Sequence, residues 1–226
     1  MTVLYRRNGI QYEKVDRTNW EEAARCVARV FASDEPLVTR LGITEEEMFS
    51  FTGNYYQKIA EEGLSILARD QRTSRVIGAR VSEDAAIPPR AEHVTGYSLK
   101  LRPVFACLET LHRVYQEERM PEPGECVHMF MVAVERRYTN RGIAPQMNHL
   151  FFEMVARMGY RHLVTEPTGA ISQHLLRDKL GFRVLHCLAY EDFEYEGRKI
   201  FAGMPEHPCI MLMEKTLVIE KNLKTA

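Results

Sequence analysis

The sequence predicts an α/β (α+β) fold, with a mixed sheet and helices on its faces, and two observations predict it. Apolar runs rich in β-branched residues, typical of buried strands, alternate with segments whose apolar residues recur at helical spacing. From residue 126 onward the order is strand, helix, strand, helix and two strands, which is typical of a mixed sheet. The chain has 226 residues and no internal repeat or obvious linker, so we expect one domain over residues 1–226.

The first half of the chain contains two helix starts and one hairpin. In a capping box, Ser or Thr stands three residues before Glu or Gln, and the two side chains bond the free N–H groups that begin a helix. Proline interrupts a helix because it lacks an N–H. The expected elements are a strand at 10–15, a helix opened by Thr18 and Glu21 and interrupted at Pro36, a helix opened by Thr44 and Glu47, and a hairpin of strands at 64–69 and 76–81.

The second half begins with a segment of irregular pattern. Residues 84–124 contain several prolines and one helical stretch, and we interpret them as an insertion that covers part of the molecule. The helical stretch within it is expected at 105–118, and the pattern after the segment is clearer. There the expected elements are strands at 126–135 and 161–165 on either side of a helix at 143–158, a helix at 170–180, and strands at 182–190 and 207–217.

Composition and charge narrow the classes of function. Lys and Arg (30) nearly balance Asp and Glu (31), for a formal net charge of −1, so nothing favours binding to nucleic acid or to an anionic membrane. No apolar run approaches the ~20 residues of a membrane span, and the first residues lack the apolar core of a signal peptide. The five cysteines are scattered among apolar neighbours, as free thiols in a reducing compartment are. We expect a soluble, cytoplasmic protein.

A glycine-containing loop joins the strand at 126–135 to the next helix. The first N–H groups of a helix lack intrahelical partners and carry partial positive charge, so they bind phosphate. Gly142 lets a ligand approach the backbone, Ala144 keeps the turn open, and Arg141 adds a cation. A single glycine at a helix start is more often structural, so the loop alone is a weak signal.

The wider pattern resembles the acetyl-CoA motif of the GNAT superfamily of N-acetyltransferases. Residues 132–134 (Val-Ala-Val) and 138–144 (Tyr-Thr-Asn-Arg-Gly-Ile-Ala) are similar to the family's strand and its R/Q-x-x-G-x-G/A loop, with Thr139 where Arg or Gln is usual. Residues 179–182 (Lys-Leu-Gly-Phe) resemble the ending of a later family helix. The resemblance spans roughly residues 20–215.

The resemblance implies a GNAT fold, with a central mixed, mostly antiparallel sheet, a V-shaped splay and flanking helices. It implies acetyl-CoA as co-substrate, with the pantetheine arm bonded to the splayed strand and the pyrophosphate held by the loop. The implied activity is acetyl transfer to a small-molecule amine by direct attack on the thioester, in a monomer or homodimer. The segment 84–124 would then lie near the acceptor site. The implied cofactor-binding residues are Val132, Ala133, Val134, Thr139, Asn140, Arg141, Gly142, Ile143 and Ala144.

A second motif bears on the general base. The run from Phe31 to Leu37, with Leu-Gly-Ile at 41–43, looks like the F-x-x-D-E-P-L motif of the insect-type arylalkylamine N-acetyltransferases, whose glutamate is the base. The resemblance assigns that role to Glu35. The chemistry needs a base because an alkylamine with a pKa near ~10 is protonated at neutral pH. Without the motif, adjacent carboxylates at a helix end are typical of a solvated turn.

The group that protonates the leaving thiol is less defined. Many superfamily members use a tyrosine four residues before the glycine of the late helix, where this chain has Arg177. The insect-type resemblance points to Ser172 or Thr168 instead, with helix capping as the structural alternative. His128, at the start of the cofactor strand, is a candidate proton relay, although a lone strand histidine is more often a packing residue.

Three further expectations complete the interpretation. The eight histidines show no metal-ligand spacing, so we expect no metal site. Two alternatives to small-amine transfer stay open: acetylation of a protein or peptide, which needs an open groove, and acyl-CoA binding by a sensor without turnover. Aromatic candidates for the acceptor wall, or for the core, are Tyr55, Tyr56, Tyr97, Phe105 and Tyr115.

Overall fold

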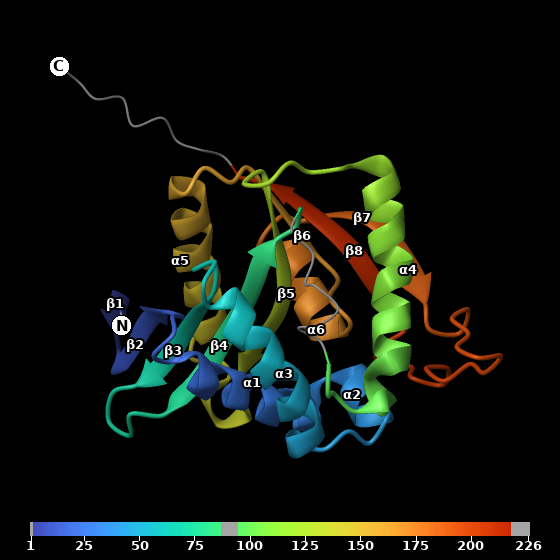
Figure 1. Ribbon diagram of the computed structural model, residues 1–226, viewed down its shortest axis with the longest axis horizontal. Helices are drawn as coiled ribbons and strands as arrows, with labels where there is room; N and C mark the ends of the chain where they lie inside the picture. The colour runs from blue at the N-terminus through green and yellow to red at the C-terminus, as the bar shows by residue number, and fades with distance from the viewer. Residues whose placement is uncertain (1, 87–94, 218–226) are drawn as a thin grey trace.

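The computed structural model describes residues 2–86 and 95–217, whose strands form one eight-stranded sheet in the order β1-β2-β3-β4-β5-β6-β8-β7 (Figure 1). Neighbouring strands are antiparallel except β5 and β6, which are parallel. The expected mixed, mostly antiparallel sheet is confirmed. The strands are β1 (Thr2–Arg7), β2 (Ile10–Lys14), β3 (Ile66–Asp70), β4 (Val76–Asp84), β5 (Cys126–Val134), β6 (His162–Thr165), β7 (Arg183–Ala189) and β8 (Cys209–Thr216).

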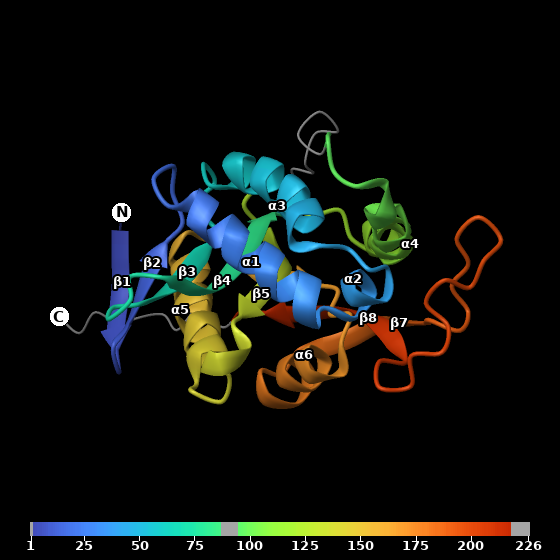
Figure 2. The same cartoon turned by 90° about the horizontal axis from the view of Figure 1, so that it is seen from below.

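Helices cover both faces of this sheet. Figure 2 shows α1, α2, α3 and α4 on one face and α5 and α6 on the other. The last of these continues as a π-helical turn at Leu175–Lys179. The helices are α1 (Trp20–Asp34), α2 (Pro36–Arg40), α3 (Glu45–Ile59), α4 (Arg102–Glu118), α5 (Ile143–Arg157) and α6 (Ala170–His174).

Alternating strand residues enter two separate cores, one on each face. On β3, Leu67 packs with residues of α1 and α3, whereas Ile66 and Ala68 pack with residues of α5. Helix α5 places Met147 and Phe151, four residues apart and both fully buried, in the second core. Burying each such side chain stabilises the fold by about 1.5–3 kcal/mol. The two cores hold both faces of the sheet and so fix the strands that form the site.

Strands β5 and β6 separate soon after they meet. They pair at only three positions, the last of which joins His128 to Val164. On its other edge β5 stays paired with β4 as far as Val134, with a β-bulge just beyond His128. Among the described strands, the edge of β5 over residues 129–134 that faces β6 therefore has no strand pairing, and it contacts β6 through the Thr165 hydroxyl, which donates to the Met129 carbonyl at 2.8 Å. This is the V-shaped splay that the GNAT resemblance implied.

Two of the expected helix signals are confirmed. Thr44 and Glu47 form the capping box of α3: the Thr44 hydroxyl accepts from the Glu47 N–H at 3.2 Å, and the Glu47 carboxylate accepts from the Thr44 N–H at 2.9 Å. Pro36 takes the first position of α2, where its missing N–H costs nothing. The first helix thus ends before this proline, as expected, and a second helix, α2, begins at it.

The start of α1 and the first strand were predicted wrongly. Helix α1 begins at Trp20, and Thr18 forms no capping box with Glu21, because its N–H and hydroxyl both donate to Asp16. Strand β1 was not expected, since it is a mostly exposed edge strand and lacks the buried alternation that marks a strand.

The irregular segment 84–124 contains α4, which packs on the same face as α1 and α3. Residues 87–94 of this segment lie outside the described part of the chain. Cys107 and Leu111 of α4 are buried in the core on that face, and the Tyr115 hydroxyl lies 3.4 Å from Sγ of Cys126 at the start of β5.

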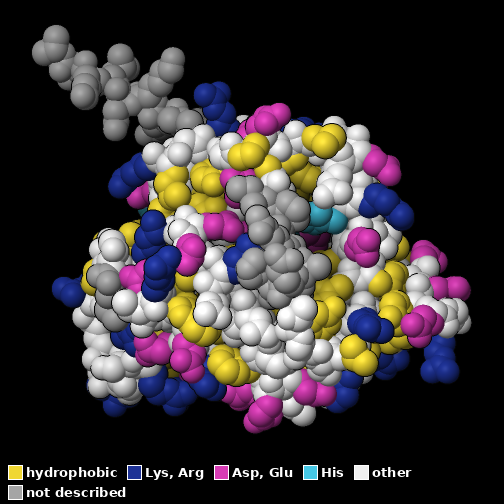
Figure 3. Space-filling view, in the orientation of Figure 1, with side chains coloured by type: hydrophobic (Ala, Val, Ile, Leu, Met, Phe, Trp, Pro, Cys, Tyr) yellow, Lys and Arg dark blue, Asp and Glu magenta, His cyan; other side chains and the backbone are white. Residues whose placement is uncertain are grey.

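Side chains of both charges are interspersed over the face in Figure 3, in agreement with the net charge of −1. Within residues 2–86 and 95–217, no helix has the length and apolar character needed to cross a membrane.

Glu62 lowers the stability of the fold at neutral pH. Its half-buried carboxylate accepts from the Asp84 N–H at 2.9 Å, and burial, with smaller effects of Glu83 and Asp84, raises its pKa from 4.5 to about 7. The folded chain therefore binds this proton more tightly than the unfolded chain, so stability falls as the pH rises from about 4.5 to about 7.

Glu62→Gln keeps an acceptor for the Asp84 N–H and removes the charge. We expect it to raise the free energy of unfolding by about 1–2 kcal/mol at a pH above this window, after allowance for solvent screening, and by much less below it. Urea unfolding at both pH values measures this. The control Glu61→Gln, at an exposed neighbour paired with Arg17, should change stability by less than about 0.5 kcal/mol at either pH. Equal effects of the two variants would contradict the assignment.

Candidate functional site

A cavity of about 320 Å³ opens where β5 leaves β6. Its walls come from α1, α2, α3, α4, β5, the start of α5 and the segment that leads from β6 into α6. Most of its lining is apolar. The polar side chains that line it are Asp34, Glu35, Arg80, Thr165, Glu166, Thr168, Ser172 and His207.

The splayed part of β5 forms one wall. All of residues 129–134 line the cavity. Phe130, Val132 and Val134 are half-buried, whereas Met131 and Ala133 are buried. Phe130, Met131 and Ala133 pack with the core of α1 and α3, and Val132 and Val134 pack with the core beneath α5. Because the edge toward β6 is unpaired here, an extended ligand can bond this backbone as an added strand would.

The loop before α5 places a helix N-terminus beside that wall. Gly142 is the N-cap residue and adopts a left-handed conformation (φ 73°), which favours glycine. Ala144 lines the cavity, whereas the side chain of Ile143 is buried in the core beneath the helix. Arg141 is exposed and stacks over the ring of Tyr138 at 5.0 Å.

The other two loop residues expected to bind a cofactor have local roles. The Thr139 hydroxyl donates to the carbonyl of Arg136 at 2.7 Å, and Asn140 adopts a left-handed backbone with φ of 62°. Neither side chain lines the cavity. Thr139 therefore closes the preceding turn, and the loop offers a ligand its backbone rather than this side chain.

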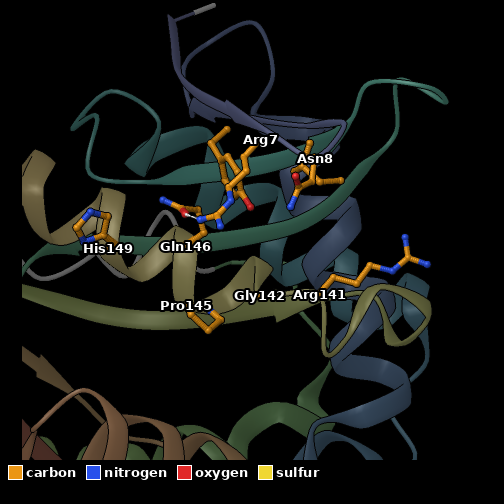
Figure 4. Close-up of a pocket in the computed structure, with 9 residues that line it drawn as sticks. Arg7, Asn8, Arg141, Gly142, Pro145, Gln146 and His149 are labelled. Carbon is orange, nitrogen blue, oxygen red and sulfur yellow. Dashed lines mark hydrogen bonds between the residues drawn. The ribbon is translucent and has the colours of Figure 1, made fainter.

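A second groove lies at the start of α5, beside the β1–β2 hairpin, with a volume of about 660 Å³ (Figure 4). Arg7 and Asn8 come from the hairpin, and Gln146 and His149 from α5; the Arg7 guanidinium donates to the Gln146 amide at 3.4 Å. In Figure 4 the side chain of Arg141 extends away from these residues. The groove is polar and exposed, in contrast to the apolar main cavity.

Glu35 stands at the junction of two helices. It ends α1 and is the N-cap residue of α2, where its Oε2 accepts from the Val38 N–H at 2.6 Å. Its Oε1 accepts from the Thr168 hydroxyl at 2.6 Å. The neighbouring Asp34 is exposed. Glu35 is therefore held by a bond to each oxygen while it lines the cavity.

The surroundings of Glu35 raise the pKa of its carboxylate. Burial raises its pKa, and the hydrogen bonds from Thr168 and Val38 lower it only in part. A carboxylate with a raised pKa holds a proton more readily than an exposed one, which suits a general base.

A cluster of ionisable side chains lies at the apex of the V, and His128 is its centre. Nδ1 of His128 is 3.0 Å from Oε1 of Glu83, directly opposite on β4, and Nε2 is 2.7 Å from Oε2 of Glu166, just after β6. His112 of α4 also contacts Glu166, with its Nδ1 3.3 Å from Oε1 of Glu166. Glu166 lines the cavity, whereas His128 lies behind it.

The charges of this cluster stabilise one another. Burial alone would lower the pKa of His128, but Glu166 and Glu83 outweigh it and raise that pKa to about 10. Burial opposes ionisation of Glu166, but the charge of His128, with a hydrogen bond from His112, keeps its pKa below the ordinary value. The cluster thus holds an imidazolium between two carboxylates.

The remaining candidates divide between cavity and core. Ser172 lines the cavity, but its hydroxyl donates to the Gly169 carbonyl at 2.8 Å, which is a local helix contact. Arg177 is exposed and pairs with Asp178. Of the aromatic candidates, Phe105 lines the cavity and the ring of Tyr97 packs against the ring of Phe105. The other three, Tyr55, Tyr56 and Tyr115, are buried.

Sequence reasoning missed Glu83, His112 and Glu166, which surround His128. They come from β4, α4 and the end of β6, and their separations along the chain match no ligand or catalytic motif. It also missed Arg80, a buried residue of β4 that lines the cavity and bonds Asn148. The available signals were the charged residues Arg80, Glu83 and Asp84 within one strand and His128 within the next.

Comparison with known proteins was made at the levels of sequence and structure. No model of a known protein family matches the chain, and no curated protein matches its sequence. Solved structures do match. The C-terminal condensation domain of Ebony, in complex with β-alanyl-dopamine, has a TM-score of 0.80 at 19% identity, over 92% of this chain and 98% of that chain.

Two insect acetyltransferases have the same architecture. The mosquito arylalkylamine N-acetyltransferase like 5b has a TM-score of 0.73 at 20% identity, over 92% of this chain and 100% of that chain. The polyamine N-acetyltransferase of Drosophila melanogaster has a TM-score of 0.70 at 18% identity, over 92% of this chain and 100% of that chain. At these identities the likeness establishes the fold, and the expected GNAT fold is confirmed.

Removal of His128 tests the electrostatics of the apex. His128→Ala leaves Glu83 and Glu166 buried without the group between them, so we expect the free energy of unfolding to fall by about 3–5 kcal/mol. Chemical denaturation measures the loss. His149→Ala, at an exposed histidine of α5, is the control and should cost less than about 0.5 kcal/mol. A loss no larger than that of the control would mean that His128 does not hold the apex together.

Proposed function

We propose that the protein is an N-acetyltransferase that moves an acetyl group from acetyl-CoA to the amine of a small molecule. One observation carries the proposal: the unpaired edge of β5 and the carboxylate of Glu35 face the same cavity. An acyl thioester bound along the strand and an amine beside Glu35 would meet there. The likeness to solved arylalkylamine and polyamine N-acetyltransferases supports the same reaction class.

The backbone of β5 and α5 accounts for the binding of acetyl-CoA in this proposal. The pantetheine arm bonds residues 132–134 as an added strand. The pyrophosphate lies at the N-terminus of α5, where the left-handed Gly142 and the small Ala144 leave the N–H groups accessible. Arg141 adds a positive charge near the phosphates. Ile143 contributes only its N–H, because its side chain is in the core.

Glu35 is the general base in this mechanism. The ammonium of the acceptor is attracted to the carboxylate, which takes one of its protons and so frees the nitrogen lone pair to attack the thioester carbonyl. A backbone N–H of the bulged part of β5 stabilises the oxyanion. The carbon–sulfur bond then breaks, the nitrogen loses its second proton, one proton reaches the thiolate, and Glu35 releases the other to water. Because a thiol of this kind has a pKa of about 8.5, the step needs little help from an acid.

The acceptor pocket favours an amine with an apolar body. Phe51, Phe105 and Phe130 line the cavity and pack together, with ring centroids 5.0 Å apart between Phe51 and Phe105 and 6.1 Å apart between Phe51 and Phe130. Thr168 fixes one oxygen of Glu35 and is a positioning residue. Ser172 lines the same cavity and is the candidate proton donor to the thiolate.

The first experiment is a thiol-release assay with acetyl-CoA and a panel of arylalkylamines, polyamines, aminoglycosides and peptides. Release with small amines supports the proposal and names the acceptor class. Release with peptides alone favours the protein N-acetyltransferase alternative. Binding of acetyl-CoA by calorimetry without release on any acceptor favours the non-catalytic sensor.

Glu35→Gln separates the catalytic role of Glu35 from its capping role. The amide oxygen can still accept from the Val38 N–H, so the fold and the affinity for CoA should persist, while kcat falls by about 10²–10⁴ with loss of the base. Steady-state kinetics and calorimetry measure the two effects. Asp34→Asn, at the exposed neighbour, is the matched control and should keep its rate within about threefold. Wild-type activity of Glu35→Gln would refute the assignment.

The pH dependence of the rate offers an independent check. A base acts only when ionised, and burial raises the pKa of Glu35. We expect kcat to fall with decreasing pH through a pKa above the ordinary 4.5 of a glutamate, and this limb should be absent in Glu35→Gln. An unchanged limb in the variant would assign the titration to another group.

A further inference from the structure

The proposed transfer does not use the ionisable cluster at the apex of the V. Four elements supply it: Glu83 comes from β4, His128 from β5, Glu166 follows β6, and His112 projects from α4. The side chains of Glu83, His128 and Glu166 are 6%, 7% and 2% exposed, whereas that of His112 is 30% exposed. Three deeply buried charged groups beside one accessible imidazole call for a role beyond the fold.

The donor atoms of three of these residues are close enough to share one ion. One ring nitrogen of His112, one of His128 and a carboxylate oxygen of Glu166 lie within 4.8 Å of one another. Two donors on a tetrahedral ion with bonds of about 2.0–2.1 Å are roughly 3.4 Å apart. The two imidazoles contact different oxygens of Glu166: Oε1 lies 3.3 Å from Nδ1 of His112, and Oε2 lies 2.7 Å from Nε2 of His128. An ion between the imidazoles would therefore be held by both carboxylate oxygens, and the shorter contact would lengthen to admit it.

Glu83 orients one of these donors. It bonds Nδ1 of His128 at 3.0 Å, which places a proton on Nδ1 and directs Nε2 toward Glu166. Histidines that bind metals almost always donate their second N–H to a carboxylate or carbonyl in this way, and the bond strengthens the ligand. Glu83 has the same relation to His128.

Unsatisfied atoms and access also point to a ligand. Oε2 of Glu83 is buried without a hydrogen-bond partner among the described residues, and the closest partner of the buried Oε1 of Glu166 is Nδ1 of the half-exposed His112, at 3.3 Å. Glu166 also lines the cavity, which gives an ion both a route of entry and a coordination position open to water or a ligand.

We propose that His112, His128 and Glu166 bind a divalent transition-metal ion, with Zn²⁺ preferred and Glu83 as the residue that orients His128. Two imidazole nitrogens and one carboxylate with an open position suit Zn²⁺ better than Mg²⁺ or Ca²⁺, which select oxygen ligands. The ion takes the place of the proton shared between His128 and Glu166. Binding requires no acetyl transfer, so it stands or falls apart from the proposed function.

The test is a titration of the metal-free full-length protein with Zn²⁺ against a chromophoric chelator, at about pH 8. We expect one equivalent to bind with submicromolar affinity. His112→Ala removes a half-exposed ligand without emptying the core, and it should weaken binding by at least about 100-fold, whereas Glu83→Gln should weaken it by about 10–100-fold. Thermal unfolding without metal verifies that each variant is folded.

His149→Ala is the matched control, because His149 is an exposed histidine of α5 outside the cluster, and it should bind as the wild type does. Co²⁺ gives a second readout: the wild type should show the visible bands of a four- or five-coordinate ion without the charge-transfer bands of thiolate ligation. Two results would overturn the proposal: equal affinity of the wild type and His112→Ala for Zn²⁺, or thiolate bands in the Co²⁺ spectrum, which would assign the ion to cysteines.

Discussion

The site depends on one constraint, which is that β5 and β6 stop pairing after His128 and Val164. Had the pairing continued, the backbone of residues 129–134 would be satisfied within the sheet and the cavity would not exist. The fold tolerates the open edge because β4 pairs with the other side of β5 as far as Val134 and the two cores clamp both faces. A gap between two parallel strands thus becomes a place where an extended ligand can bind.

The apex of this gap is held by charge. Buried carboxylates are costly unless they are paired, and here His128 lies between Glu83 on one strand and Glu166 beyond the other. The imidazolium therefore joins β4, β5 and the end of β6 at the point where the backbone ladder ends. His112 extends the network to α4, so the helix of the irregular segment is tied to the same point.

Local signals predicted much of this molecule, and contacts between distant segments account for what they missed. Helical spacing predicted α5, the Thr44 and Glu47 pair predicted the start of α3, and Gly142 marked the start of α5, where the structure gives it a left-handed backbone. The motif resemblance singled out Glu35, and the structure places this residue in the wall of the cavity. Local patterns could not reveal that Glu83, His112 and Glu166 surround His128, since each belongs to a different element. They also misplaced the start of α1, because Thr18 prefers the nearer carboxylate of Asp16.

The two hydrogen bonds of Glu35 have a consequence for how such a residue can change. The same carboxylate ends one helix, begins another and faces the cavity, so most replacements would disturb the chain direction at Pro36 as well as the chemistry. Glutamine alone among the common side chains has the length and the acceptor to preserve the junction. A single such exchange would leave an intact protein that still recognises its ligands, which gives a short mutational route from a catalyst to a receptor.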